Sequence, residues 1–156
     1  MLVEPKHPGN IGAVARAMKA MDLRRLVLVR PHEFPAAEAE RRALGAVDIL
    51  DRAEVLEDVS QAVADCRTVI GCTSRARAHA HPILDARQAG TELVLQAARG
   101  DEVAVLFGPE RTGLLNQDLN ACTFELRIPT SKDFRSLNLA SAVQLVAYEV
   151  FMACQS

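Results

Sequence analysis

The chain has 156 residues, of which 49% are hydrophobic and 24% are charged, and its formal net charge is −2. This composition is typical of a single globular domain with a sizeable core, and it excludes a disordered or strongly basic chain. No apolar run approaches the roughly 18 residues of a membrane helix, so we expect no membrane association. The four cysteines form no C-x-x-C pair, which argues against a zinc site and a disulfide framework. The N-terminus shows no signal-peptide pattern, so we expect a cytoplasmic protein.

Apolar runs of strand type alternate with segments of helical periodicity along the chain. The predicted strands are residues 2–5, 25–30, 53–58, 68–74, 102–108 and 124–129. The predicted helices are residues 10–21, 35–45, 60–66, 85–100 and 136–154, with a short helical turn at 116–122. Gly45 is the expected C-cap of the second helix and Ser60 the expected N-cap of the third. This alternation predicts an α/β fold, in which a mostly parallel sheet carries helices on both faces.

Polar loops follow four of the predicted strands. Ligands of such sheets bind beyond the carboxyl ends of the strands. The four loops read KHPGNIGAVAR, TSRARAHAHP, GPERTG and PTSKDFRSLN. One loop of this kind is an ordinary turn, but four at one edge of a sheet predict a binding site. The loop 108–113 matches neither G-x-x-x-x-G-K-[ST] nor G-x-G-x-x-G, so we do not expect it to hold the phosphates of a nucleotide.

Three segments of the chain carry a family resemblance. HPGNIGAVARAMKAM, FGPERTGL and IPTSKDFRSLNLASAV resemble, in order and spacing, the three signature motifs of the SpoU branch of the SPOUT RNA methyltransferases. The likeness spans nearly the whole chain and is greatest to the TrmJ group, which methylates the ribose 2′-hydroxyl at position 32 of the tRNA anticodon loop. The segments GCTSRAR and VQLVAYEVFMA are also similar to that group. The resemblance implies a C-terminal trefoil knot, S-adenosyl-L-methionine held bent within it, and a homodimer with active sites near the subunit interface.

The resemblance also implies which residues bind the cofactor. They are Thr73, Ser74, Arg75, Gly108, Glu110, Gly113, Ile128, Arg135, Ser136 and Leu137. Glycines at 108 and 113 permit close approach of the backbone, and main-chain groups near 108, 128 and 137 are expected to contact the adenine. Glu110 has two interpretations: it braces its loop, or it faces the sulfonium. No metal is expected, because the pair of histidines in HAHP (79–82) has no third ligand nearby.

The resemblance implies a catalytic role for Arg16, with Asn10, Ser136 and Asn138 shaping the active site or contacting the substrate. Ordinary structural roles stay open for three of them: Asn10 and Ser136 as helix caps, and Arg16 as a solvated or ion-paired side chain. An arginine side chain stays protonated in proteins. We therefore expect Arg16 to bind a neighbouring phosphate or the developing alkoxide, and not to abstract the proton itself.

We expect residues 1–156 to form a single catalytic domain, without the C-terminal tRNA-binding extension that is usual in the TrmJ group. The expected partner is tRNA, attracted by a local basic patch made of Lys6, Arg16, Lys19, Arg75, Arg77, Lys132 and Arg135. Three alternatives stay open: ribosomal RNA as the substrate, a catalytically silent RNA-binding module, and an ordinary doubly wound nucleotide-binding enzyme. The last is disfavoured, because no Gly-rich phosphate loop follows the first strand.

Overall fold

The computed structural model of the chain describes residues 1–74 and 81–156. Its strands are β1 (Leu2–Val3), β2 (Val27–Val29), β3 (Glu54–Leu56), β4 (Thr68–Cys72), β5 (Ile83–Leu84), β6 (Val103–Phe107) and β7 (Phe124–Leu126). Its helices are α1 (Pro8–Ala20), α2 (Ala37–Ala43), the 3-10 turn η1 (Leu44–Ala46), α3 (Val47–Asp51), α4 (Val59–Ala62), α5 (Ala86–Ala98), α6 (Asn116–Asn120) and α7 (Leu139–Cys154).

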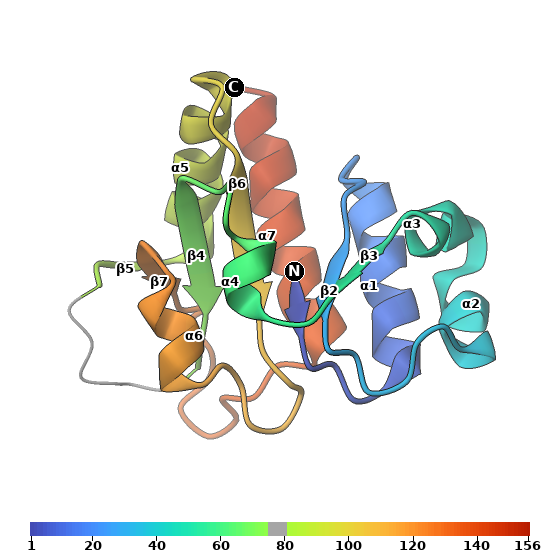
Figure 1. The fold of residues 1–156 in the computed structure, drawn as a ribbon. Coiled ribbons are helices and arrows are strands. Elements are labelled where there is room, and N and C mark those ends of the chain that lie inside the picture. Colours follow the sequence, from blue (N-terminus) through green and yellow to red (C-terminus); the bar gives the residue numbers. More distant parts are fainter. Residues whose placement is uncertain (75–80) are drawn as a thin grey trace.

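The strands of the described part of the chain form one sheet in the order β3-β2-β1-β6-β4-β7-β5. Every pairing between these strands is parallel, which confirms the predicted fold class. The two longest strands, β4 and β6, pair along their whole length, from Thr68 opposite Val103 to Cys72 opposite Phe107. Their carboxyl ends therefore meet at one edge of the sheet, at the bottom of Figure 1.

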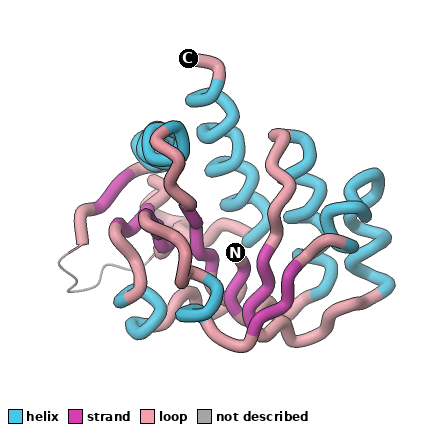
Figure 2. The backbone as a smooth tube through the Cα atoms, turned by 45° about the horizontal axis from the view of Figure 1, so that its top comes forward, coloured by secondary structure: helices cyan, strands magenta, loops and turns pink. Residues whose placement is uncertain are grey.

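Helices cover both faces of the sheet. On one face α7 lies between α5 and α1 (Figure 1), over the larger core, which includes Val14 of α1, Leu93 of α5 and Val143 of α7. On the other face α4 and α6 lie over a smaller core that includes Val59 and Leu119. Figure 2 shows the strands between these two sets of helices. The central strands are thus largely buried on both sides, whereas the edge strands β3 and β5 are more exposed.

The predicted C-cap at Gly45 is wrong. α2 ends at Ala43, and Leu44 follows it with a positive φ of 49°. Gly45 lies within η1, which leads directly into α3. The sequence did not predict α3, because five residues are too few to show a helical period.

Two helices are capped by a residue two positions away from the predicted N-cap. Asp58, not Ser60, caps α4: one carboxylate oxygen accepts from the N–H of Gln61 at 2.8 Å and from the Ser60 hydroxyl at 2.7 Å. These hydrogen bonds hold the pKa of Asp58 below its usual range, and the one from Ser60 has the largest effect. Asn138, not Ser136, caps α7, because its side-chain oxygen accepts from the N–H of Ala140 at 2.9 Å.

In the two described ranges, no helix combines the length and the apolarity needed to span a bilayer. All four cysteines belong to these ranges and are free thiols. The trefoil knot that the resemblance implies stays a prediction.

Candidate active site

A pocket lies at the carboxyl edge of the sheet, beyond the ends of β4, β6 and β7. Three segments line it: residues 72–74, residues 107–113, and parts of residues 128–142. The two longer loops lie together below the sheet in Figure 1. Three of the four polar loops singled out by the sequence therefore meet in one pocket.

The loop after β6 folds back on itself. A Cβ atom added at Gly108 would lie 2.3 Å from the carbonyl carbon of Gly113 and 2.3 Å from the nitrogen of Leu114. Gly113 has a φ of 70°, and its N–H donates to the carbonyl oxygen of Pro109 at 2.9 Å. Lack of space therefore requires glycine at 108, and the backbone conformation favours glycine at 113.

The carboxylate of Glu110 ties this loop to the fourth polar loop, which precedes and opens α1. Its Oε1 accepts from the backbone N–H of Lys6 at 2.9 Å. Its Oε2 accepts from the backbone N–H of His7 and from the side-chain amide of Asn10, both at 2.9 Å. Both oxygens thus point toward the N-terminus of α1, where a negative charge is also favoured by the helix dipole.

The three hydrogen bonds decide between the two roles expected for Glu110. Partial burial raises the pKa of its carboxyl, but the hydrogen bonds from Lys6, Asn10 and His7 outweigh that effect and lower the pKa overall. The side chain is therefore a charged acceptor that braces two loops. The observed hydrogen bonds support the bracing role and leave none of its oxygens without a donor.

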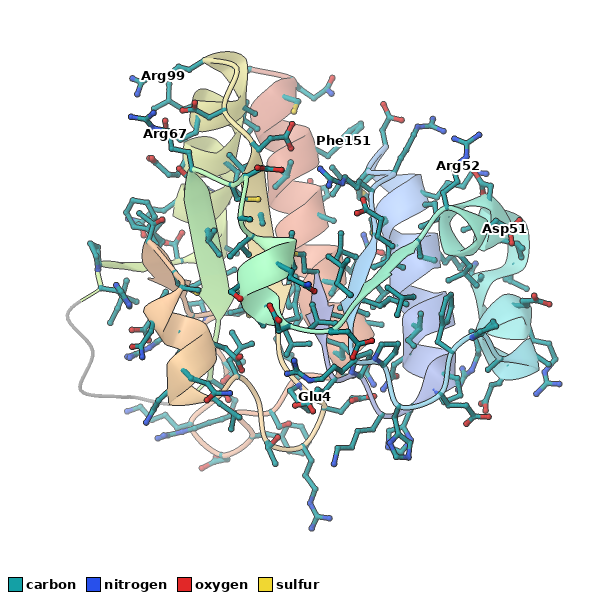
Figure 3. The ribbon with its side chains drawn as sticks, in the orientation of Figure 1. Glu4, Asp51, Arg52, Arg67, Arg99 and Phe151 are labelled. Carbon is teal, nitrogen blue, oxygen red and sulfur yellow. The ribbon has the colours of Figure 1, made fainter. Side chains whose placement is uncertain are left out.

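An ion pair also joins the carboxyl ends of β1 and β2, close to the hydrogen bonds of Glu110. Glu4 follows β1 and Arg30 follows β2, and both adopt positive φ, of 48° and 46°. Their side chains form an ion pair, with 3.5 Å between Arg30 Nε and Glu4 Oε1. Figure 3 shows Glu4 near the carboxyl edge, whereas Arg67 and Arg99 lie at the opposite edge of the sheet, far from the pocket.

The opposite wall of the pocket is the segment between β7 and α7. Ile128, Arg135, Ser136 and Leu137 line the pocket, and Leu137 keeps 37% of its surface exposed. The hydroxyl of Thr130 donates to the carbonyl oxygen of Arg135 at 3.3 Å. The hydrogen bonds described within this wall are longer than the three that Glu110 accepts.

Cys72 lies at the base of the pocket as a protonated thiol. Burial raises the pKa of its side chain to about 12. The thiolate that a nucleophilic cysteine needs is therefore scarce at neutral pH. Within the described residues, the pocket thus offers hydrogen-bonding and apolar groups but no activated cysteine.

The pocket brings together most of the residues predicted to bind the cofactor. Those that line it are Thr73, Ser74, Gly108, Glu110, Gly113, Ile128, Arg135, Ser136 and Leu137. Arg75 lies outside the described residues, as do Arg77 and His79. The assignment of these residues to a cofactor stays a prediction.

The residues predicted to be catalytic are not all at the pocket. Ser136 lines it, and Asn10 is joined to it through Glu110. Asn138 caps α7, and Arg16 is exposed on α1, six residues beyond Asn10 and outside the pocket lining. Within residues 1–74 and 81–156, Arg16 forms no hydrogen bond or ion pair. Of the two structural roles left open for it, the single chain therefore shows the solvated side chain and not the ion pair.

The predicted basic patch wrongly includes one residue and omits another. Lys19 belongs to the other end of α1, where its ammonium group contacts the Asp48 carboxylate and the carbonyl oxygen of Gly45, each at 2.9 Å. It is therefore paired within the chain and wrongly included. Arg111 was missed, although it lines the pocket. Its place directly after Glu110 in the second motif was the available signal.

The pair of histidines in the sequence gives no metal site that the structure describes. His81 Nε2 lies 2.9 Å from the carbonyl oxygen of Leu119, within hydrogen-bond distance. No group of three or more potential metal ligands occurs among the described residues.

The pocket suits a cofactor with an adenine, a ribose, a carboxylate and a sulfonium, and no phosphate. Ile128 and Leu137 supply apolar surface for a flat ring, and Thr73 and Ser136 supply hydroxyl groups. Arg135 supplies a guanidinium for a carboxylate. Among the described residues, the glycine-containing loop that lines the pocket does not start a long helix, because α6, which follows it, has only five residues. These groups fit S-adenosylmethionine.

Comparison with known proteins agrees with this fold. Residues 1–148 match the SpoU rRNA Methylase family. The chain therefore belongs to the SpoU methylase family.

Similar proteins include the tRNA (cytidine/uridine/adenosine-2′-O-)-methyltransferase TrmJ of Pseudomonas aeruginosa (strain UCBPP-PA14), which is 47% identical over 153 residues. That alignment covers 98% of this chain but only 60% of the relative, so the chain spans less than two thirds of its length. The crystal structure of TrmJ from Z. mobilis ZM4 is 39% identical with a TM-score of 0.92, covering 99% of this chain and 69% of that one.

An AdoMet-bound rRNA methyltransferase from Sinorhizobium meliloti shares the fold, with a TM-score of 0.76 and 22% identity. The alignment covers 99% of this chain and 56% of that one.

Proposed function

We propose that the chain is the catalytic domain of an S-adenosylmethionine-dependent RNA methyltransferase that acts on a ribose 2′-hydroxyl of tRNA, at position 32 of the anticodon loop. The observation that carries this proposal is the pocket at the carboxyl edge, joined through Glu110 to Asn10 and the helix of Arg16. The 47% identity to a tRNA 2′-O-methyltransferase supports tRNA as the substrate. The cytoplasm is the compartment that this function implies.

The proposed cofactor would supply the methyl group. Ile128 and Leu137 would contact its adenine. Thr73 and Ser136 would form hydrogen bonds with its hydroxyl and carboxylate oxygens, and Arg135 would pair with the negative charge of the carboxylate. Glu110 does not take part directly: it fixes the loop that forms one wall and orients Asn10. The pocket therefore acts mainly by positioning, and alignment of reacting groups is worth several kcal/mol.

Arg16 is the residue that we propose to act on the attacking 2′-hydroxyl. A guanidinium keeps its charge and presents a fork of donors that suits a phosphate or an alkoxide. Arg16 would hold the neighbouring phosphate or stabilise the alkoxide as it forms, while the proton leaves to water or to a phosphate oxygen. Electrostatic stabilisation of this kind is also worth several kcal/mol.

Arg16 does not line the pocket of its own chain, so we place it in the site of a second copy. α7 supports such a homodimer, because one of its faces is apolar and exposed. Leu145, Tyr148 and Met152 are spaced three and four residues apart and are 43%, 45% and 44% exposed. A two-fold dimer would bury this stripe against itself.

The substrate is tested by methyl transfer from tritiated S-adenosylmethionine. We expect incorporation into a tRNA transcript and none into a matched transcript that carries 2′-deoxyribose at position 32. Transfer to ribosomal RNA fragments alone would instead support the rRNA alternative. A folded chain that binds the cofactor and RNA but transfers no methyl group would support the silent module.

The shared site is tested by mixing Arg16→Ala with Leu137→Glu, each expected to be inactive alone. If Arg16 acts in the partner's pocket, half of the sites in mixed dimers are intact, and exchange restores about a quarter of wild-type activity. If Arg16 acts within its own chain, mixing restores nothing. Arg16→Lys keeps the charge but loses the fork, so near-full activity in that variant would contradict the role proposed for the guanidinium.

A further inference from the structure

Phe134 is an aromatic side chain left in water beside the pocket. It is 75% exposed, the highest value among the large hydrophobic side chains of the described ranges. The next is Leu44, at 58%. Burying such a ring is favourable, so its exposure needs a reason.

The loop that carries Phe134 has a defined shape. The hydroxyl of Thr130 donates to the carbonyl oxygen of Arg135 at 3.3 Å, and the N–H of Asp133 donates to the hydroxyl of Ser131 at 3.2 Å. These hydrogen bonds close the turn on both sides of the ring. Phe134 is therefore presented at the rim by a bent loop, and the next residue along the chain already lines the pocket.

Positively charged residues lie close to Phe134 in the sequence and in the lining of the adjacent pocket. Lys132 and Arg135 flank it in the sequence, with Asp133 as the one negative charge between them. Arg111 lines the pocket from the other loop. The whole chain has a net charge of −2, so attraction of a polyanion depends on local groups such as these. An exposed aromatic ring among cations is the arrangement with which proteins bind single-stranded RNA: bases stack on the ring, and phosphates contact the cations.

We propose that Phe134 is a stacking platform for an unpaired base of the RNA, next to the ribose that enters the pocket. This inference rests on the proposed function and adds a recognition element to it. A stacked duplex hides the faces of its bases, so the platform selects single-stranded loops. Lys132 holds a phosphate next to that base.

A second copy of the chain is the competing occupant of this surface. The cores of subunit interfaces are depleted of charged residues. The exposed stripe of α7 meets that description, because Leu145, Tyr148 and Met152 are uncharged. Phe134, with charged residues on both sides, does not.

The test compares wild type with Phe134→Ala and Phe134→Tyr, and Val55→Ala serves as control because it shortens another exposed apolar side chain, 50% exposed on β3. The probes are an RNA hairpin with 2-aminopurine in its loop, next to the target ribose, and a fully paired duplex of equal length. We expect Phe134→Ala to weaken hairpin binding about 5- to 150-fold and to abolish the quenching of 2-aminopurine. Phe134→Tyr and Val55→Ala should bind like wild type.

Three further readouts separate stacking from other roles. S-adenosylhomocysteine affinity and the sedimentation coefficient should not change in Phe134→Ala. The slope of log affinity against log salt should also stay constant in Phe134→Ala but fall by about one in Lys132→Ala, which loses a phosphate contact. Dissociation of the dimer by Phe134→Ala would assign the ring to a second copy and overturn the proposal.

The same experiment separates this proposal from the proposed function. If wild type methylates the hairpin and Phe134→Ala binds it equally well, or weakens hairpin and duplex alike, stacking is wrong and the methyltransferase stands. If folded wild type neither binds nor methylates any RNA, the proposed function fails and the stacking platform fails with it.

Discussion

The two loops that face each other across the pocket are built differently. Residues 108–113 fold tightly, with no room for a Cβ at Gly108. Three hydrogen bonds of 2.9 Å join Glu110 to Asn10 of α1 and to the two residues Lys6 and His7 before that helix. Residues 130–137 are exposed and are held by hydrogen bonds of 3.2 and 3.3 Å. A fixed wall suits a cofactor that has the same shape in each turnover, whereas an exposed wall suits a polymer whose bases must be accommodated. The comparison predicts that substitutions in the first loop cost stability and cofactor affinity together, and that substitutions in the second leave stability unchanged.

Gly108→Ala should have the largest effect. The added methyl group meets backbone atoms of Gly113 and Leu114, which cannot move without reshaping the loop. We expect the free energy of unfolding to fall by about 1–3 kcal/mol and S-adenosylhomocysteine binding to be lost. Urea unfolding and calorimetry measure the two effects. Gly45→Ala is the control: a Cβ there meets nothing within 4 Å, so we expect a change within about 0.5 kcal/mol. Equal effects of both substitutions would contradict the tight packing of the first loop.

Glu110→Gln should follow. The amide nitrogen cannot accept the hydrogen bonds that one carboxylate oxygen now accepts, so we expect a loss of about 1–2 kcal/mol. Glu102→Gln, which only breaks an exposed ion pair with Arg25, should cost at most about 0.5 kcal/mol.

The pH dependence of stability sharpens this prediction. The pKa of Glu110 is lower in the folded chain than its ordinary value. Its contribution is therefore fully present above the ordinary carboxyl range and is lost as pH falls through the lowered pKa. Chemical unfolding between neutral and acid pH should show a shallower loss in Glu110→Gln than in wild type. Parallel curves would mean that the hydrogen bonds to Glu110 do not stabilise the fold.

Ser136, within the second loop, and Asn138, the helix cap just after that loop, should separate cofactor binding from stability. Asn138→Ala removes the cap of α7 and should cost about 1 kcal/mol. Ser136→Ala should change stability by less than about 0.5 kcal/mol while weakening S-adenosylhomocysteine binding, because its side chain lines the pocket without capping the helix. A loss of stability in Ser136→Ala equal to that in Asn138→Ala would mean that Ser136 also caps α7.

The smallest expected effect is a difference in reactivity between the buried and the exposed thiols. Burial raises the pKa of Cys72 to about 12, and burial with the nearby Asp118 and Glu125 raises that of Cys122 to about 12, whereas Cys154 is exposed. With iodoacetamide at pH 8, Cys154 should be labelled at least about tenfold faster than either buried thiol. Peptide mass spectrometry measures the rates. Fast labelling of Cys72 would mean that the base of the pocket opens to solvent.

The sequence predicted the long elements but missed two short ones, α3 and β5. α1, α5 and α7 each bury an apolar face over 13 or more residues, so their period is visible. α3 has five residues and β5 has two, too few to show a period. The cap residues Asp58 and Asn138 each lie two residues from the serine that was predicted, which is within the usual uncertainty of helix ends.

The candidate site was predictable as a set of loops but not as a set of contacts. A parallel sheet brings its strand ends to one edge, so Thr73, Gly108 and Ile128 were expected to meet. The hydrogen bond between Asn10 and Glu110 joins residues 100 positions apart, and no local pattern encodes it. The exposure of Phe134 depends on the path of its loop, which periodicity does not describe.

The most direct test of the central claim is S-adenosylhomocysteine binding measured by calorimetry on the wild-type chain, Leu137→Glu and Leu115→Glu. Leu137 lines the pocket and is 37% exposed, whereas Leu115 is 47% exposed and outside the lining. We predict micromolar binding by wild type and Leu115→Glu, and none by Leu137→Glu. Absence of binding by the folded wild-type chain, or equal binding by Leu137→Glu, would contradict the assignment of the cofactor to this pocket.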